Sequence, residues 1–443
     1  MAGQLFRWCC LGTLLADDTG RTHRIRGQGG IRRVNRPSVV TPDLCESDIP
    51  ATQGSAPAWS AGRRAWYDGA AWRPAGLGQE ARGVGHGAVC GAVALALVVL
   101  ACSCGAAAPR LERVVVAPDG KGFVGAESGQ RFAPRGFNYD HDRASRLLED
   151  YWEAEWPTVV EDFREMKALG ANVVRIHLQV ARFMDGPDRP NAASLDRLGR
   201  LVALAEDTGL YLDVTGLGCY RRRDVPDWYR DQDEAGRWQT QQRFWEAVAA
   251  RCAKSRAVFC YDLMNEPVVP TARPVPADWL VGEFGGFSFV QRITLDPAGR
   301  PPAQIARQWI GRMTAAIQRH DTQHLITIGL LPFPGGGTGL ASREVAELLG
   351  FLSVHIYPAS GKMPEARRTV EGFAVGKPLV LEEIFPLTCT VPELGRFLED
   401  VRPHVAGWIG FYWGKTPTEL SCSGEISDAV TLGWLRLFQE MKP

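Results

Sequence analysis

The sequence predicts a (β/α)8 barrel with an N-terminal β-hairpin, and three observations support this fold. Apolar, strand-like runs alternate with amphipathic, helix-like stretches from residue 113 to the C terminus. Near-continuous apolar strands joined by helical crossovers form parallel sheets that helices cover on both faces. Eight such units in about 310 residues fit a closed barrel better than a doubly wound sheet. No Gly-x-Gly-x-x-Gly follows the first strand, so a dinucleotide-binding fold has no support.

Each predicted element follows from its local pattern. Asp119-Gly120 and Ser128-Gly129 are turn signals between short apolar runs and predict the hairpin. The predicted strands are 135–138, 172–177, 210–215, 258–264, 325–330, 351–356, 379–383 and 408–413. The predicted helices are 157–169, 194–208, 241–254, 303–319, 343–349 and 431–441. In such a barrel the chemistry belongs at the carboxyl ends of the strands.

Composition excludes several classes of protein. Hydrophobic residues make up 45% of the 443 residues and charged residues 23%. These are ordinary globular values, which exclude a collagen, a chain disordered throughout and a polytopic membrane protein. Lys+Arg and Asp+Glu both number 50. No global field therefore draws the chain to nucleic acid, and no nucleic-acid partner is expected.

Residues 1–87 predict a disordered basic leader. They show no helical or strand period and are rich in Arg, Gly, Pro, Ser and Ala. Such a segment buries too little apolar surface to offset the entropy of ordering. Its excess of arginine is interpreted as a solvated tail. We hypothesise that translation starts further downstream and that the mature protein lacks this leader.

Residues 88–110 predict an export signal and a tether. Residues 88–102 carry no charge. Fifteen residues are too few for a membrane-spanning helix but suit the apolar region of a signal peptide. Val99-Leu100-Ala101-Cys102 resembles the lipobox of bacterial lipoproteins, in which the cysteine is acylated. We therefore expect a secreted or cell-envelope protein, attached to the membrane only through a lipid anchor at Cys102. The alternative is a buried apolar strand or helix.

The remaining segment, 111–443, contains five of the eleven cysteines: Cys219, Cys252, Cys260, Cys389 and Cys422. No Cys-x-x-Cys occurs, so neither a zinc ribbon nor a thioredoxin-like site is supported. An odd number leaves at least one thiol free or paired outside this segment. Cys389 and Cys422 are a candidate disulfide between late loops.

The predicted strand ends carry acids, an arginine and aromatic residues. In chain order they are Asn138, Tyr139, Arg175, His177, Asp213, Thr215, Asn265, Glu266, His355, Tyr357, Glu383 and Trp413. Two carboxylates at one barrel mouth are what acid catalysis and nucleophilic attack at an acetal centre need. One carboxyl must be protonated and the other ionised. Arg175 and Tyr357 are suited to holding one of them ionised.

Here the pattern becomes specific. Asn265-Glu266-Pro267 after an apolar strand, with Glu383 further along, resembles the retaining (β/α)8 glycosidases, and within them glycoside hydrolase family 5, the cellulase and mannanase family. The supporting pieces are Arg135-Gly-Phe-Asn-Tyr139, Gly170-Ala-Asn-Val-Val-Arg-Ile176, His355-Ile-Tyr357, Lys377-Pro-Leu-Val-Leu-Glu-Glu383 and Phe411-Tyr-Trp413. They run in family order from about 113 to 443, so the resemblance covers the whole barrel segment.

The resemblance implies a role for each matching residue. Glu266 is implied as the general acid and later the base, and Glu383 as the nucleophile. Asn265 is implied to bind the sugar 2-hydroxyl, and His355 to line the −1 subsite. Arg175 and Tyr357 are implied to orient Glu383, and Trp413 to form the floor of the subsite. His177 follows Arg175 by two residues and should share its face, lining the site; the alternative is a core histidine.

Glu382 competes with Glu383 for the nucleophile role. The family places its nucleophile five residues after the Lys-Pro proline, which from Pro378 is Glu383. Adjacent strand residues point to opposite faces, so we expect only one of the two glutamates in the site. The chain departs from the family in 213–218, where a histidine is common, and in Ile384-Phe385, which replaces an aromatic-Gly pair. Because of these departures, the identity of the sugar in the substrate remains open.

Other motifs have plainer interpretations. His320-x-x-x-His324 has metal-ligand spacing but lies at the bottom of the predicted barrel, so a structural role is favoured. The glycine-rich 334–339 lacks the lysine of a phosphate-binding loop and is interpreted as a βα loop. A sugar platform and a packing role remain equally open for five tryptophans in the predicted loops: Trp152, Trp156, Trp228, Trp238 and Trp279.

The sequence thus predicts a monomeric retaining β-glycosidase that acts on a polysaccharide or oligosaccharide of the β-glucan or β-mannan type. The predicted reaction needs no metal or organic cofactor. Two alternatives remain: an inactive carbohydrate-binding surface lipoprotein, and a transglycosylase of the same family. The sequence leaves the sugar, the linkage and endo against exo action open, and 267–302 is the segment expected to open or close the cleft.

Overall fold

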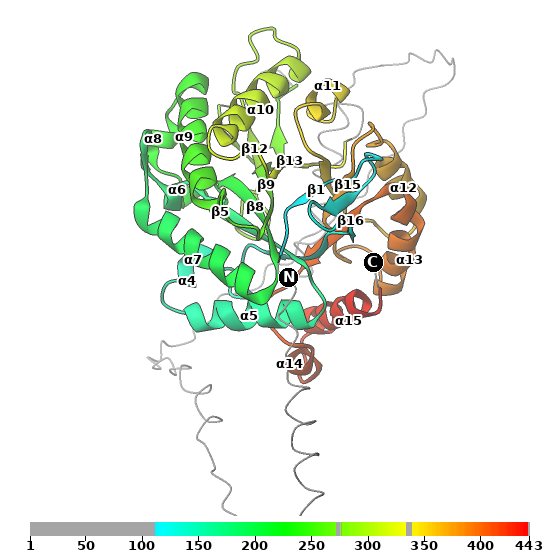
Figure 1. The fold of residues 1–443 in the computed structure, drawn as a ribbon. Coiled ribbons are helices and arrows are strands. Elements are labelled where there is room, and N and C mark those ends of the chain that lie inside the picture. Colours follow the sequence, from blue (N-terminus) through cyan, green and yellow to red (C-terminus); the bar gives the residue numbers. More distant parts are fainter. Residues whose placement is uncertain (1–110, 272–274, 276, 334–338, 442–443) are drawn as a thin grey trace, which may run out of the picture. The chain divides into compact units, whose positions relative to one another are not determined.

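The computed structural model describes residues 111–271, 275, 277–333 and 339–441, which form a closed barrel with helices around it (Figure 1). The predicted leader and signal segment lie outside the described residues, as does most of the glycine-rich 334–339. Among the described residues, no helix combines the length and the apolar character that crossing a bilayer requires.

The barrel confirms the predicted fold. Its eight strands are β4 (Arg135–Tyr139), β5 (Val173–Gln179), β8 (Tyr211–Gly218), β9 (Val258–Asn265), β13 (Leu325–Leu330), β14 (Leu352–His355), β15 (Leu379–Glu383) and β16 (Gly407–Phe411). They pair in parallel in the closed order β13-β14-β15-β16-β4-β5-β8-β9. Each lies at a predicted position, because long apolar runs bounded by turn residues identify buried parallel strands well.

Helices lie around the strands in Figure 1. The longer ones are α5 (Trp156–Ala168), α7 (Ala192–Thr208), α9 (Glu234–Cys252), α10 (Pro302–Gln318), α12 (Met363–Glu371), α13 (Val391–Val401) and α15 (Ile426–Glu440). Short ones are α4 (Leu148–Tyr151), α6 (Val180–Phe183), α8 (Asp227–Arg230), α11 (Arg343–Ala346), α14 (Pro417–Ser421), and the 3-10 helices η1 (Arg222–Asp224) and η2 (Arg402–His404). The six predicted helices are present.

Sequence reasoning missed α12 and α13 for different reasons. Val370 is the one buried residue recorded for α12, which leaves too weak an apolar period to recognise. A readable signal does precede α13: Thr390 accepts from the backbone N–H of Glu393, whose side chain reaches back to the Thr390 N–H. This capping box, Thr-x-x-Glu, marks a helix start in sequence.

The predicted hairpin is present and gains a third strand. β1 (Val114–Val116) pairs with β2 (Phe123–Gly125), and β2 with β3 (Arg131–Phe132), all antiparallel. Phe123 is completely buried and contacts Phe259 and Phe351 edge-on, with ring centroids 5.2 Å and 5.1 Å apart. Both partners lie where barrel strands begin. The hairpin therefore closes the amino-terminal end of the barrel, and the opposite end carries the site.

Two small sheets lie at the carboxyl end of the barrel. The segment after β9 folds as β10 (Pro267–Val268), β11 (Leu280–Val281) and β12 (Val290–Arg292), with β12 in the middle. A two-stranded ribbon, β6 (Met184–Gly186) and β7 (Arg189–Pro190), follows α6. The first sheet places 281–290 beside the carboxyl end of β9, because Pro267 directly continues from Glu266.

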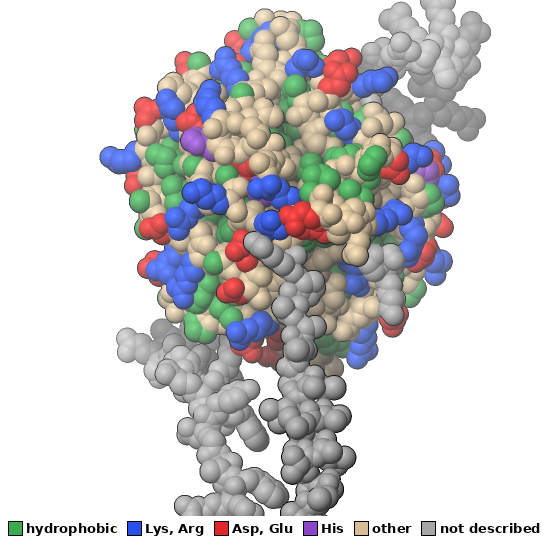
Figure 2. Space-filling view, in the orientation of Figure 1, with side chains coloured by type: hydrophobic (Ala, Val, Ile, Leu, Met, Phe, Trp, Pro, Cys, Tyr) green, Lys and Arg blue, Asp and Glu red, His purple; other side chains and the backbone are tan. Residues whose placement is uncertain are grey.

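Two minor predictions can be settled. Cys389 and Cys422 are both free thiols, so the candidate disulfide is wrong; one lies in the loop after β15 and the other at the end of α14. His324 is buried, and its Nδ1 lies 2.5 Å from Asp321 Oδ2, whereas His320 is exposed; the structural interpretation is confirmed. Figure 2 shows basic and acidic side chains intermixed on the face in view, with no large field of one sign there.

Candidate active site

Arg175 organises the carboxyl end of the barrel. It projects from β5 and is completely buried. Its Nη1 donates to Glu383 Oε1 at 2.6 Å and to Asn138 Oδ1 at 3.0 Å. Its Nη2 donates to Asp262 Oδ2 at 2.7 Å and to Asn265 Oδ1 at 3.0 Å. Burial alone lowers the pKa of a guanidinium, but the surrounding acids raise the pKa of Arg175 well above its usual value. It remains a fixed cation.

Glu383, at the end of β15, is held on both carboxylate oxygens. Arg175 binds Oε1, and the Tyr357 hydroxyl donates to Oε2 at 2.7 Å. Burial and the charge of Glu383 raise the pKa of Tyr357 well above its usual value, so the phenol keeps the proton that it donates. The predicted orienting pair is thus assembled around Glu383. Hydrogen bonds from two donors favour the ionised carboxylate.

Glu266 stands in a different environment. Its backbone has φ +46°, a left-handed conformation that few non-glycine residues adopt. Its N–H donates to the Gly329 carbonyl at 3.0 Å, and its own carbonyl accepts from the Gln291 N–H at 3.3 Å. Strands on both sides therefore hold this turn, as expected when strain is kept at a functional position.

Glu266 is 1% exposed, and among the described residues no arginine forms an ion pair with its carboxyl. Oε1 lies 3.0 Å from His355 Nδ1, while the buried Oε2 has no hydrogen-bond partner among the described residues. Burial raises the pKa of Glu266, and the charge of Glu383 raises it further, whereas the hydrogen bond from His355 lowers it; the net direction is up. A raised pKa suits a carboxyl that must carry a proton.

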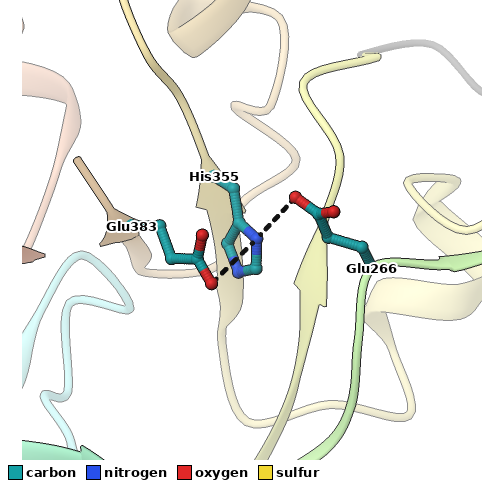
Figure 3. A group of neighbouring side chains, drawn as sticks. All are labelled: Glu266, His355 and Glu383. Carbon is teal, nitrogen blue, oxygen red and sulfur yellow. Dashed lines mark hydrogen bonds and ion pairs between the residues drawn. The ribbon is translucent and has the colours of Figure 1, made fainter. Parts of the chain in front are cut away.

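His355 lies between the two glutamates (Figure 3). Its Nδ1 is 3.0 Å from Glu266 Oε1 and 3.5 Å from Glu383 Oε1. Burial by itself lowers the pKa of an imidazole, but Glu383, Glu266 and Glu382 together raise the pKa of His355 to about 10. The ring is therefore an imidazolium at neutral pH and donates from both nitrogens.

One atom from each of Glu266, His355 and Glu383 lies within 4.8 Å of the others, which is a spacing that could hold a metal ion. The donor atoms are already engaged, however. Glu383 Oε1 accepts from Arg175, and His355 Nδ1 faces Glu266. A third positive charge beside a guanidinium and an imidazolium is electrostatically unfavourable.

The expectation that only one of Glu382 and Glu383 faces inward is wrong. β14 and β15 pair Val354 with Leu381 but His355 with Glu383, so Glu382 is an extra residue in a bulge. A bulge breaks the strict alternation of side chains. Glu382 Oε2 consequently lies 3.3 Å from His355 Nε2 and 3.6 Å from Arg175 Nη2. Glu382 is completely buried, and Glu383 is 8% exposed.

Two further acids lie buried beneath Arg175. Asp262 accepts from Thr215 at 2.8 Å and from the Gly329 N–H at 2.8 Å. Burial and the neighbouring Glu382 raise the pKa of Asp213 well above its usual value. Burial opposes ionisation of Glu382, but Arg175 and His355 lower its pKa. The two environments therefore shift the pKa values of Asp213 and Glu382 in opposite directions.

Asn265 and His177 also lie where predicted. Asn265 bonds Arg175 through Oδ1, and its Nδ2 donates to the Phe289 carbonyl at 3.1 Å, so the amide is fixed. His177 Nδ1 lies 2.5 Å from the Tyr220 hydroxyl and Nε2 lies 3.3 Å from Asn138 Oδ1. Burial and then Arg175 lower the pKa of His177 well below its usual value, so this ring is neutral.

Trp413 belongs to an aromatic series that starts at Tyr357. Tyr357 stacks on Phe411, with centroids 6.4 Å apart, and Phe411 stacks on Trp413 at 5.3 Å. β16 ends at Phe411, two residues earlier than predicted. Phe411 is thus the ring in contact with Tyr357, and Trp413 adds the next layer.

The five tryptophans left open are packing residues. Trp152, Trp238 and Trp279 are at most 5% exposed. Trp238 donates to the Ile293 carbonyl at 2.7 Å, and Trp279 to the Arg230 carbonyl at 3.1 Å. Arg200 stacks over Trp156, and Trp228 contacts Tyr229 edge-on. Trp156, Trp228 and Trp238 lie in helices instead of loops.

Asp140 and His141 are neighbours of the site that sequence reasoning missed. Asp140 is buried, and its Oδ2 lies 2.9 Å from His141 Nδ1. Its Oδ1 has no hydrogen-bond partner among the described residues. Burial raises the pKa of Asp140, but His141 and His177 outweigh it and lower the pKa. Their position directly after Tyr139, at the end of the first strand, was the available signal.

A cavity of about 310 Å³ adjoins Glu266 and Tyr357. Phenylalanines line much of it, namely Phe284, Phe287, Phe289 and Phe333. Sequence reasoning sought sugar platforms among tryptophans and did not consider these rings. Phe284, Phe287 and Phe289 lie within 267–302, the segment expected to shape the cleft.

Comparison with known proteins gives three findings. A model described as Cellulase (glycosyl hydrolase family 5) matches residues 126–360, more than half of the chain. The chain is 26% identical over 215 residues to mannan endo-1,4-beta-mannosidase A from Emericella nidulans, a match that spans 43% of this chain and 48% of that protein, about half its length.

Solved structures show the same fold. An exo-beta-1,4-mannosidase from an Opitutaceae bacterium is 20% identical, with a TM-score of 0.55, over 74% of this chain and 61% of that one. A beta-1,4-mannanase from the sea hare Aplysia kurodai is 14% identical, with a TM-score of 0.51, over 74% and 96%. At these identities the likeness is one of fold.

Proposed function

The chain belongs to glycosyl hydrolase family 5, and from this premise we propose that it hydrolyses β-glycosidic bonds by double displacement, with retention of anomeric configuration. Glu383 is the proposed nucleophile and Glu266 the proposed acid/base. One observation carries the proposal: oxygens of the two carboxylates lie within 4.8 Å of each other. Retaining glycosidases hold these groups about 5–5.5 Å apart, whereas inverting enzymes need about 6.5–9.5 Å to admit water.

In the first step, Glu383 attacks the anomeric carbon and forms a glycosyl ester. The bond to the leaving oxygen breaks, and Glu266 gives that oxygen its proton. The raised pKa of Glu266 supports this role, because it extends the acid form of the carboxyl to higher pH. Arg175 and Tyr357 each donate a hydrogen bond to the Glu383 carboxylate and fix its orientation.

In the second step, water attacks the anomeric carbon and Glu266 takes the water's proton. The ester bond breaks, and Glu383 leaves as a carboxylate. Esterified Glu383 carries no charge, so the repulsion that raises the pKa of Glu266 disappears in the intermediate. The same carboxyl can therefore serve as an acid and then as a base.

For the sugar on the glycone side of the scissile bond, we propose β-linked mannose ahead of β-linked glucose. The support is the names of the relatives, which include an endo-mannosidase, an exo-mannosidase and a mannanase. Hydrolysis of aryl β-mannosides against aryl β-glucosides decides between the two.

The nucleophile is tested with Glu383→Ala, using Glu382→Ala as the matched neighbour. Turnover of an aryl β-glycoside should vanish in Glu383→Ala, and azide should restore it with formation of the α-glycosyl azide. Azide should not rescue Glu382→Ala. Full activity in Glu383→Ala would contradict the proposal, and sugar affinity with no release of reducing ends would favour the carbohydrate-binding alternative. Transfer to an added sugar acceptor would favour a transglycosylase.

We further propose that the protein is exported as a lipoprotein acylated at Cys102 and acts as a monomer. The uncharged 88–102 and the sequence Val99-Leu100-Ala101-Cys102 support export. Metabolic labelling with a fatty acid in a bacterial host should mark the wild type but not Cys102→Ala. A mature protein that retains residues 1–80 would contradict this proposal. Gel filtration tests the proposed monomeric state, because an apparent mass of twice the chain mass would contradict it.

A further inference from the structure

Most of the described residues that line the cavity beside Glu266 are apolar. Its walls come from the sheet after β9, the loops after β13, β14 and β15, and helix α12. The apolar members are Val281, Phe284, Phe287, Phe289, Val290, Leu331, Pro332, Phe333, Ile356, Pro358, Ala359, Ala366 and Leu387. Its charged residues Glu283, Lys362 and Glu365 are exposed, so their charges face water.

The position of the cavity relates it to the departing group. Glu266 and Tyr357 line it, whereas Arg175, Glu383, Asn265 and His177 do not. In Figure 3, Glu266 reaches His355 from the side opposite Glu383. The general acid protonates the oxygen of the leaving group, so that group lies on the acid's side of the scissile bond. The cavity therefore receives the leaving group of the proposed reaction.

The chemistry of the walls selects among leaving groups. A second sugar would bring several hydroxyls into this space, and each one left without a partner costs about 1–3 kcal/mol. Among the described lining residues, the polar side chains apart from Glu266, the proposed acid, are Tyr357, Thr369, Thr388 and the three exposed charged residues. An alkyl or aryl group needs no partners, and it gains by leaving water.

We propose that this enzyme cleaves β-glycosides whose leaving group is an apolar alcohol, and that the cavity beside Glu266 binds the alkyl or aryl part. The inference rests on the proposed function, because it uses Glu266 as the acid. It narrows the substrate class from β-linked glycans in general to glycosides with a hydrocarbon aglycone.

The test is a series of n-alkyl β-glycosides, from methyl to octyl, with one glycone sugar and the full chain. Primary alcohols leave with similar ease, so kcat/KM reports binding of the alkyl chain. We expect kcat/KM to rise about threefold for each added methylene until the cavity is full. A β-linked disaccharide of the same glycone should be a poorer substrate than the octyl glycoside.

A β-glycosyl fluoride tests the proposed glycosidase function separately from the proposed leaving-group preference, since fluoride leaves without occupying the cavity. Turnover of the fluoride together with a flat alkyl series, or with a preference for the disaccharide, overturns this inference alone. A chain that cleaves neither the fluoride nor any glycoside overturns the proposed function, and the inference fails with it.

Two variants on α12 place a charge in the cavity wall. Ala366→Glu and Thr369→Glu lie one turn apart, both half-buried and lining the cavity. Each should reduce the octyl-to-methyl ratio of kcat/KM about tenfold or more. Arg368→Glu changes an exposed residue of the same helix that does not line the cavity, and it should leave the ratio unchanged. Equal ratios in all four proteins would overturn the proposal.

Discussion

The two sides of the barrel mouth give the same chemical group two different environments. On one side Glu383 accepts from Arg175 at 2.6 Å and from Tyr357 at 2.7 Å. On the other, Glu266 has one oxygen near His355 and a second with no partner among the described residues, and an apolar cavity lies beside it. The contrast teaches that one barrel mouth can give two glutamates environments of opposite character, which the proposed division into a nucleophile and an acid requires.

Removing the Arg175 guanidinium should have the largest effect, because the buried acids around Glu383 then lose the cation that they share. Arg175→Met leaves Asp262, Glu382 and Glu383 buried without their shared partner. Such unpaired buried charge costs about 3–5 kcal/mol. We expect turnover to be lost and the urea midpoint to fall sharply, with Arg175→Lys recovering part of the stability. A wild-type midpoint in Arg175→Met would show that the network contributes little.

Neutralising the acid should affect substrates unequally. Glu266→Gln cannot protonate the leaving oxygen, so kcat/KM for an alkyl glycoside should fall by about 10²–10⁴-fold. A 2,4-dinitrophenyl glycoside needs no proton to leave and should lose much less in the glycosylation step. Steady-state comparison of the two substrates checks this. Equal losses on both would argue that Glu266 does not act as the acid.

The buried neighbour of the nucleophile should matter less. Glu382→Gln keeps Glu383 and its two donors but weakens the contacts of Glu382 with His355 and Arg175. Leaving a buried partner unsatisfied typically costs about 1–3 kcal/mol, so we expect kcat to fall by about 10–100-fold. KM should change little, since Glu382 is completely buried. An effect as large as that of Glu383→Gln would reopen the choice between the two glutamates.

The smallest expected effect is a change in the pKa of Glu266 between two states of the enzyme. The charge of Glu383 raises this pKa in the free enzyme. Activity that needs protonated Glu266 is therefore retained to higher pH and falls as pH rises through the raised pKa. Trapping Glu383 as a 2-fluoroglycosyl ester should lower the pKa of Glu266, measured by carbon NMR of labelled glutamate. An unchanged or higher pKa would contradict electrostatic coupling between the two carboxyls.

The fold and the polar residues around Glu383 could be predicted because both depend on local sequence patterns. Apolar runs fix the eight strands, and the strand ends place Arg175, Asn265, His355 and Tyr357 together. The inward turn of Glu382 could not be predicted, since it depends on a one-residue bulge in the pairing of β14 with β15. The apolar cavity was missed because its walls combine the segment 281–290 with loops far along the chain, and no periodicity marks its phenylalanines.

Double displacement requires the carboxylates of Glu266 and Glu383 to lie close together, with no room for a water molecule between them. The most direct test follows the anomeric protons by NMR during the first minutes of β-glycoside hydrolysis, before the free sugar mutarotates. Because carboxylate oxygens of Glu266 and Glu383 lie within 4.8 Å of each other, we predict that the β-anomer forms first and the α-anomer appears later. If the α-anomer forms first, the reaction inverts configuration, and Glu383 is not the nucleophile.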